Sequence, residues 1–196
     1  KMAGCILTSE GKMSGLNVTD TLANRGGTAV AADALAIFKK LLNDAHSKEW
    51  KPTALGLSVC ELVNREGEIV SEFTLPWRNP TALDLFREHL PVVVEADSRA
   101  AAQAEATFGA GQAFSSFLFV TIGTGISCCM VIDGEPYLGA HGCTGTMATG
   151  ILSTLCSECG TISQSCLEQM ASGRGIENRF AKLSESPQRT EKMTAK

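Results

Sequence analysis

The chain has 196 residues, of which 44% are hydrophobic and 19% charged, and its formal net charge is −4. Apolar residues are too plentiful for a disordered chain. We see no run of about 20 apolar residues, which a membrane span needs, and no signal peptide, so we expect a cytoplasmic protein without a membrane partner. Its 21 acidic and 17 basic side chains argue against a nucleic-acid contact from this segment and suit a small neutral or magnesium-bound ligand.

The predicted elements of the first half alternate between strands and helices. In chain order we expect a strand at 2–6, a return strand after a turn at Gly11, a helix at 29–45 with Thr28 as N-cap, a strand at 54–63, a turn at Gly67, a helix at 83–90 and a strand at 91–95. The last of these is a short β-branched run, which predicts a strand buried on both faces.

The second half continues the alternation. We expect a helix at 98–108, a buried strand at 117–122, a strand through 130–132 with an Asp133-Gly134 hairpin turn, a loop-like region at 138–166, and a helix at 165–183 interrupted around Gly173 and Gly175. This order predicts an α/β fold with a mixed sheet. Two lobes are expected, 1–112 and 113–196, with the break near 109–116.

Asp97 is the first candidate for chemistry, because it ends a predicted strand and starts a helix. Ligands of open α/β sheets bind at the carboxyl ends of strands, where a carboxylate is well placed as a general base. An N-cap role fits the position equally well. Glu95, two residues earlier, is interpreted as structural.

Two glycine-rich segments are candidates for binding an anion. Gly123-Thr124-Gly125 joins two apolar strands, and its N–H groups and threonine hydroxyl suit a phosphate, although an ordinary hairpin is the alternative. Arg25-Gly26-Gly27-Thr28 precedes a helix, but no strand leads into it, so we interpret it as a decoy.

Eight cysteines are many for this length, and we expect them to be reduced or metal-bound. Four lie in strand-like runs and are expected to be small buried hydrophobic side chains: Cys5, Cys60, Cys128 and Cys129. Three others resemble half a zinc site: Cys156, Cys159 and Cys166. Cys143 and His141 are candidates for a fourth ligand. Reduced loop thiols and a redox pair are the alternatives.

Glu168 stands in the first turn of the last predicted helix. The helix dipole stabilises a carboxylate at such a position, which is the structural interpretation. Its two oxygens could equally bind the hydroxyl groups of a ligand.

In this order, the segments resemble the ROK family (repressor, open reading frame, kinase) of sugar kinases and sugar-responsive regulators. The resemblance is carried by the strand at 92–97, the glycine loop at 121–126, the turn and Tyr-x-Gly-Ala segment at 131–140, and the Cys-Leu-Glu and Ala-Ser-Gly run at 166–173. The family's Gly-x-x-Gly-Glu-x-Gly-His segment corresponds to 142–149.

The resemblance implies an actin-like, hexokinase-type (ribonuclease H-like) α/β fold with mixed sheets, flanking helices and two lobes. It implies that ATP with magnesium phosphorylates a hexose or N-acylhexosamine, with Asp97 taking the proton of the sugar 6-hydroxyl. The sugar-binding positions of the family correspond to Glu95, Ala96, Asp97, Gly145, Thr146, Thr149 and Glu168. Its phosphate loop corresponds to Gly123, Thr124 and Gly125, and its zinc ligands to Cys156, Cys159 and Cys166.

Three of these positions depart from the family pattern. Ala96 replaces an asparagine, Thr146 a glutamate and Thr149 a histidine. Each lost sugar contact is worth about 1–3 kcal/mol. The wide spacing between Cys159 and Cys166 also departs from the family's zinc motif. The alternative function is therefore a non-catalytic, sugar-sensing regulator of the transcriptional repressor type.

The two ends of the chain complete the comparison with the family. We expect the family's Asp-x-Gly-Gly-Thr strand before Lys1 and the adenosine-binding part of the second lobe beyond Lys196. The second lobe is thus expected to be incomplete here, and nucleotide binding to need the full-length protein. A small-molecule sugar is the expected partner, and a homodimer is left open.

Overall fold

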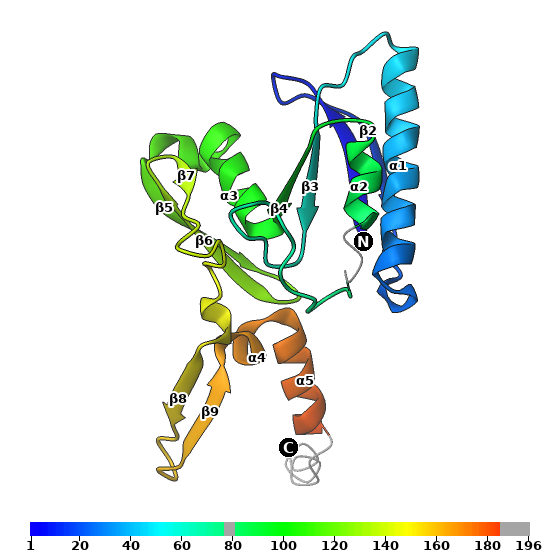
Figure 1. The fold of residues 1–196 in the computed structure, drawn as a ribbon. Coiled ribbons are helices and arrows are strands. Elements are labelled where there is room, and N and C mark those ends of the chain that lie inside the picture. The colour runs from blue at the N-terminus through cyan, green and yellow to red at the C-terminus, as the bar shows by residue number, and fades with distance from the viewer. Residues whose placement is uncertain (77–80, 185–196) are drawn as a thin grey trace, which may run out of the picture. The chain divides into compact units, whose positions relative to one another are not determined.

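The computed structural model describes residues 1–76 and 81–184 (Figure 1). The chain forms two compact units: unit 1 contains residues 1–100 and 140–142, and unit 2 contains residues 101–139 and 143–196. None of the helices in the described part of the chain is long and apolar enough to cross a membrane. The expected lobe boundary at residue 112 stays a prediction about the whole protein.

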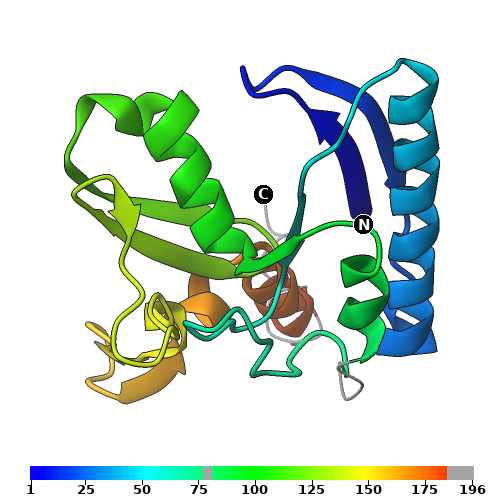
Figure 2. The same cartoon turned by 45° about the horizontal axis from the view of Figure 1, so that its top comes forward.

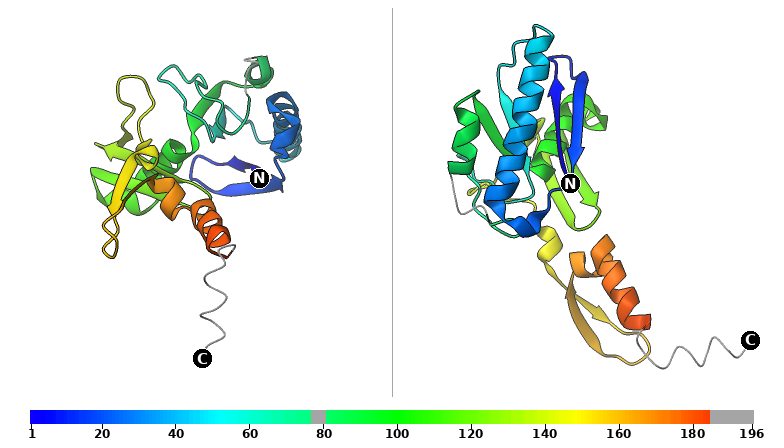
Figure 3. Two further views of the ribbon diagram at one scale, coloured as in Figure 1. Left: turned by 90° about the horizontal axis from the view of Figure 1, so that it is seen from below. Right: turned by 90° about the vertical axis from the view of Figure 1, so that its right-hand side faces the viewer.

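Unit 1 begins with an antiparallel hairpin of β1 (Met2–Leu7) and β2 (Met13–Thr19), whose register shifts between Gly4 and Ile6. After the short helix η1 (Ala23–Arg25), α1 (Gly27–Ser47) runs alongside this hairpin (Figure 3). A Cβ atom on Gly4 would lie 2.8 Å from Cγ2 of Ile37, so the missing side chain lets α1 pack closely on β1.

The predicted first helix is confirmed, but its expected N-cap is wrong. The helix begins at Gly27, and Gly26 stands at the N-cap with a φ of 86°. Glycine adopts this left-handed backbone without strain, which lets the helix begin before Thr28. The carbonyl of Gly26 then accepts the first helical hydrogen bond from the N–H of Val30, at 3.2 Å.

The second sheet of unit 1 pairs β3 (Leu55–Val59) in parallel with β4 (Val92–Ala96). Helix α2 (Thr81–Arg87) lies between them in sequence. Two expectations are wrong here. β3 ends four residues early, and β4 is not buried on both faces, because Val93 is 67% exposed while Val94 is 5% exposed. In the described residues β4 pairs with β3 alone, and only one of its faces meets the core that includes Val63.

Helix α3 (Asp97–Phe108) follows β4 directly. The boundary between the two units lies inside this helix, between Ala100 and Ala101. After η2 (Ala110–Ala113), β5 (Ser116–Ile122), β6 (Ile126–Ile132) and β7 (Glu135–Pro136) form an antiparallel sheet (Figure 2). Its core contains Ala102, Cys129 and Val131. β5 is not buried on both faces, because its residues alternate between this core and solvent.

The turn between β6 and β7 is confirmed at Asp133-Gly134. Both residues have a left-handed backbone, with φ values of 53° and 80°, as a tight hairpin of this kind requires.

The region expected to be a loop at 138–166 contains a second hairpin. The short helix η3 (Met147–Thr149) leads to β8 (Ile151–Leu155), which pairs with β9 (Ile162–Cys166). β-branched and leucine residues on both sides of the Gly160 turn favour strands over a loop. The predicted interruption of the last helix is confirmed, since α4 (Leu167–Ala171) ends before α5 (Gly173–Ser184).

Candidate functional site

The predicted site residues are divided between the two units. Unit 1 holds the end of β4, with Glu95, Ala96 and Asp97. Unit 2 holds the predicted phosphate loop, the predicted sugar-binding residues from Gly145 onward and the three predicted metal-binding cysteines: Gly123, Thr124, Gly125, Gly145, Thr146, Thr149, Cys156, Cys159, Cys166 and Glu168.

Asp97 lies at the carboxyl end of β4, where the parallel pair with β3 ends. Its carboxylate is exposed, and Oδ1 accepts a hydrogen bond from the N–H of the adjacent Ser98 at 2.7 Å. An N-cap instead accepts from an N–H two or three residues further on. The contact with Ser98 is therefore not the usual N-cap contact, and the exposed carboxylate remains a candidate general base at the end of β4.

The thiol of Cys60 is hydrogen-bonded to Asp97. Cys60 follows β3, so the ends of the two paired strands bring both side chains together. Desolvation and the negative charge of Asp97 raise the pKa of the Cys60 thiol to about 11. The thiol is therefore protonated at neutral pH and donates to the carboxylate. The expectation that Cys60 is a buried hydrophobic residue is wrong, because the residue is exposed, whereas Cys128 and Cys129 are buried as expected.

Arg99 is a residue of this region that the sequence interpretation missed. Its side chain is 3% exposed, and its Nε donates to Oε1 of Glu95 at 2.6 Å, within an ion pair in which Arg99 is buried and Glu95 is half-buried. Its other nitrogens donate to the carbonyl oxygens of Val63, at 2.6 Å, and Gly142. The sequence did contain a signal for this ion pair, because Arg99 is the only basic residue of the alanine-rich helix and stands four positions after Glu95. Glu95 also accepts from the N–H of Ala96 at 2.7 Å, in keeping with its structural interpretation.

In unit 2 the predicted phosphate loop and Glu168 lie together. Oε2 of Glu168 accepts a hydrogen bond from the N–H of Ile126 at 2.8 Å. A Cβ atom on Gly125 would lie 2.6 Å from the same oxygen, so the carboxylate packs directly on the glycine. Glu168 thus holds the turn between β5 and β6, a role that neither interpretation of the sequence included.

The same turn is held by the start of α5. The N–H groups of Gly173 and Arg174 donate to the carbonyl oxygens of Gly123, at 2.7 Å, and Thr124, at 3.4 Å. Within the turn, the N–H of Gly123 donates to the carbonyl of Gly125 at 2.9 Å. With Ile126 also engaged, the loop offers a phosphate the N–H groups of Thr124 and Gly125 and the Thr124 hydroxyl. Groups of this kind are the donors from which a phosphate accepts hydrogen bonds, and phosphate binding by this loop stays a prediction.

The predicted sugar segment turns back on itself between Gly145 and Thr149. A Cβ atom on Gly145, whose φ is 94°, would lie 2.0 Å from the carbonyl oxygen of Cys128 in β6. The N–H and hydroxyl of Thr149 both donate to the carbonyl of Thr146, at 3.2 and 2.8 Å. The Thr149 hydroxyl is thereby engaged by the backbone.

The three cysteines expected to share a metal ion are not gathered in one place. Cys156 and Cys159 lie in the turn between β8 and β9, whereas Cys166 is the last residue of β9. A strand rises about 3.3 Å per residue, so the length of β9 puts about 13 Å between its two ends. Among residues 1–76 and 81–184 there is no group of three or more histidine, cysteine, aspartate or glutamate residues that could hold a metal ion.

Among the exposed thiols, Cys159 should be more reactive than Cys60. Hydrogen bonds from Thr161, whose hydroxyl lies 2.9 Å from Sγ, and then from Cys156 lower the pKa of Cys159 to about 7. Because the thiolate is the nucleophile, iodoacetamide at pH 7 should alkylate Cys159 about 100-fold faster than Cys60, whose pKa is about 11. Timed alkylation followed by peptide mass spectrometry measures both rates, and equal rates would contradict this assignment.

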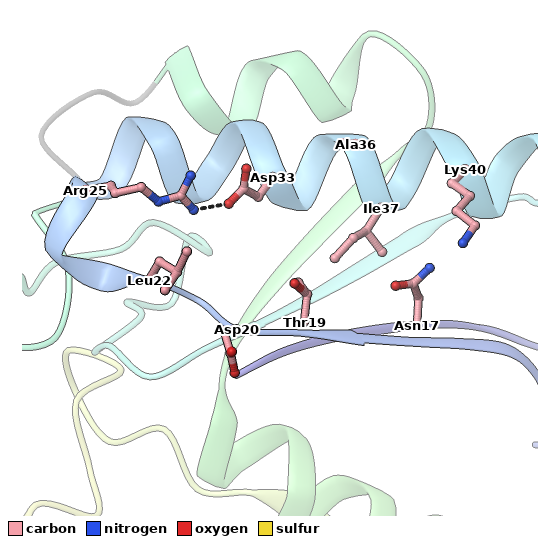
Figure 4. A pocket seen from close by; sticks show the side chains of 9 residues that line it. All are labelled: Asn17, Thr19, Asp20, Leu22, Arg25, Asp33, Ala36, Ile37 and Lys40. Carbon is pink, nitrogen blue, oxygen red and sulfur yellow. Dashed lines mark hydrogen bonds and ion pairs between the residues drawn. The ribbon is translucent and has the colours of Figure 1, made fainter.

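A separate pocket of about 420 Å³ lies between β2 and α1 in unit 1 (Figure 4). Arg25 and Asp33 form an ion pair on its wall. In this pair the carboxylate of Asp33 balances the charge of Arg25. The interpretation of Arg25-Gly26-Gly27-Thr28 as a decoy stays a prediction. None of the residues predicted to bind sugar or nucleotide lines this pocket.

The model of the ROK family matches residues 1–196, so the chain belongs to the ROK family. A glucokinase from Halalkalibacterium halodurans is 27% identical over 180 residues, which are 90% of this chain and 54% of the relative. A xylose repressor from Bacillus subtilis is 27% identical over 124 residues, 62% of this chain and 32% of the repressor. The chain thus spans about half the length, or less, of these relatives.

The crystal structure of a ROK family glucokinase from Streptomyces griseus, in complex with glucose and AMPPNP, superposes with a TM-score of 0.72. The two sequences are 27% identical, and the match covers 92% of this chain and 56% of the glucokinase. The fold class expected from the sequence, the actin-like, hexokinase-type α/β fold, is confirmed, with the chain covering about half of it.

Proposed function

We propose that the chain is part of a ROK sugar kinase, which transfers a phosphoryl group from ATP to a hexose or N-acylhexosamine in the cytoplasm. The observation that carries the proposal is Asp97, an exposed carboxylate at the carboxyl end of a parallel strand pair. A carboxylate in this position can take the proton of a sugar hydroxyl as that oxygen attacks the phosphorus. The similarity to glucokinases supports this choice.

ATP with Mg²⁺ would supply the phosphoryl group and neutralise its charge. Of this chain's residues, Asp97 would accept the proton, and the Thr124 hydroxyl and nearby N–H groups would contact a phosphate. Glu168 would orient sugar hydroxyls with the oxygen that does not hold Ile126.

A sugar-sensing regulator is the second candidate. The hydroxyl of Thr149 is engaged by the backbone, and Ala96 has no side-chain donor, so both positions offer a sugar less than the family's polar residues would. The similarity to a xylose repressor favours the same candidate. Phosphorylation of a sugar by the full-length protein would decide for the kinase.

Sugar titration tests the proposed binding. Thr146 and Thr149 are shorter and uncharged compared with the family's glutamate and histidine, so glucose should bind the full-length protein with a Kd of about 1 mM. N-acetylglucosamine or N-acetylmannosamine should bind more tightly if the bulkier substituent fills the space. Calorimetry measures all three sugars.

A gain-of-contact variant provides the matched comparison. Thr146→Glu combined with Thr149→His should tighten glucose binding about tenfold, whereas Thr154→Glu on the exposed strand β8 should leave it unchanged. Micromolar glucose binding by the unmodified protein would show that other residues replace the missing contacts and that the interpretation of the two threonines is wrong.

A further inference from the structure

We propose that Arg99 is a positioning residue, which holds the start of the predicted sugar segment, 142–149, against the loop that follows β3. The expected effect on sugar affinity rests on the proposed function. The docking itself is independent of any sugar and can be measured without one.

Three parts of unit 1 converge on the Arg99 guanidinium. Glu95 comes from the end of β4 and Val63 from the loop after β3. Gly142 lies 43 residues after Arg99 in the chain. A guanidinium presents five donors in a rigid planar fork, so one side chain can satisfy acceptors in several directions. At 3% exposure, Arg99 has almost no water available to replace any of them.

Gly142 supplies an independent reason for the same docking. Its φ is 71°, and a Cβ atom there would lie 2.7 Å from the backbone carbon of Asn64 and from the backbone nitrogen of Arg65. Only glycine allows backbone to meet backbone this closely. This close approach brings the Gly142 carbonyl within reach of Arg99. The absent side chain of Gly142 and the guanidinium of Arg99 therefore both stabilise the packing of Gly142 on the loop after β3.

The docked position is favoured because the Gly142 carbonyl is an acceptor for a charged group. If the 140–142 segment moved away, Arg99 would lose this charge-assisted hydrogen bond and would keep only its contacts with Glu95 and Val63 inside the protein. A lysine would keep the charge but would lack the fork that reaches three separate acceptors. Arg99 therefore acts on the sugar segment through Gly142, and we assign it no contact with a substrate.

Hydrogen–deuterium exchange on the full chain tests the docking. In Arg99→Met, peptides covering 138–146 and 60–66 should exchange about tenfold faster than in the wild type, and Arg99→Lys should lie between the two. The matched control is Arg87→Met, which removes an exposed arginine paired with Asp84 and should change neither peptide. Gly142→Ala should accelerate the same two peptides with Arg99 intact.

Unchanged exchange in a folded Arg99→Met protein would overturn the proposal. If that variant does not fold, unchanged exchange in both Arg99→Lys and Gly142→Ala would overturn it equally. Sugar calorimetry on the same proteins separates the two proposals. A wild type that binds none of the three sugars refutes the proposed function, while the exchange result still decides the docking.

If the wild type binds sugar, the affinities of the variants test whether Arg99 positions the sugar segment. We then expect Arg99→Met to weaken sugar binding about tenfold, with partial recovery in Arg99→Lys. Equal affinity in the wild type and Arg99→Met, despite faster exchange, would overturn the positioning role.

Discussion

Replacing Asp97 by asparagine in the full-length protein should lower the turnover of sugar phosphorylation by about 100-fold or more. Asparagine keeps the shape of the side chain, and its amide oxygen can still accept from the N–H of Ser98, so the fold should be intact. An amide cannot take a proton from the sugar hydroxyl, so the loss should appear in kcat. Steady-state kinetics at saturating sugar and ATP, with circular dichroism of both proteins, measures this.

Asp84→Asn is the matched control for this variant. Asp84 is an exposed carboxylate in α2 that pairs with Arg87, and its replacement should leave turnover within about twofold. Equal turnover in the wild type and Asp97→Asn would reject Asp97 as the general base.

Replacing Glu61 by alanine should lower the free energy of unfolding by about 3 kcal/mol. Glu61 is 5% exposed, and its carboxylate accepts four hydrogen bonds. The donors are the hydroxyl of Ser71, at 2.5 Å, and the N–H groups of Phe73, Thr74 and Leu75, at 2.9, 2.6 and 3.0 Å. Alanine would leave all four donors without their acceptor. Urea unfolding followed by circular dichroism measures the loss.

Glu66 offers a comparison on the same loop. Its side chain is exposed, so Glu66→Ala should change the free energy of unfolding by less than about 0.5 kcal/mol. Equal stability losses in the two variants would show that the hydrogen bonds to Glu61 do not hold the loop.

The stabilisation by Glu61 should depend on pH. Burial acts to raise the pKa of Glu61, but the hydrogen bonds from Ser71 and the three N–H groups outweigh it and lower the pKa below its ordinary value of 4.5. The contribution is therefore fully present above pH 4.5 and is lost as the pH falls through the folded-state pKa. The stability difference between the wild type and Glu61→Gln should narrow accordingly, and a constant difference from pH 3 to pH 7 would contradict this.

The parts of the fold that could be predicted from the sequence depend on near neighbours in the chain. The pattern of α1 and the Asp133-Gly134 turn are local, and both are confirmed. The exposed face of β4 depends on which strands flank it, which no local pattern contains. β8 and β9 were missed because the glycine, serine and cysteine residues around them resemble a loop.

The candidate site shows the same limit. Asp97 could be placed at a strand end because the strand and the helix that meet there are both local features. The contact between Glu168 and Ile126 joins residues 42 positions apart, and that between Arg99 and Gly142 joins residues 43 apart. Such contacts need the folded backbone, so the contact of Arg99 with Gly142 could not be predicted from the sequence, although the spacing of four residues favours its ion pair with Glu95.

The position of Gly142 has a consequence for how the chain folds during synthesis. Unit 1 takes its last three residues, 140–142, from a stretch that is translated only after the β5–β6 hairpin. Until that stretch emerges from the ribosome, Arg99 has one acceptor too few, and its burial is disfavoured. The antiparallel β5–β6 hairpin of unit 2, whose contacts are local, can form earlier in its own right. We therefore expect unit 1 to complete its folding after β5 and β6, although most of its residues are made first.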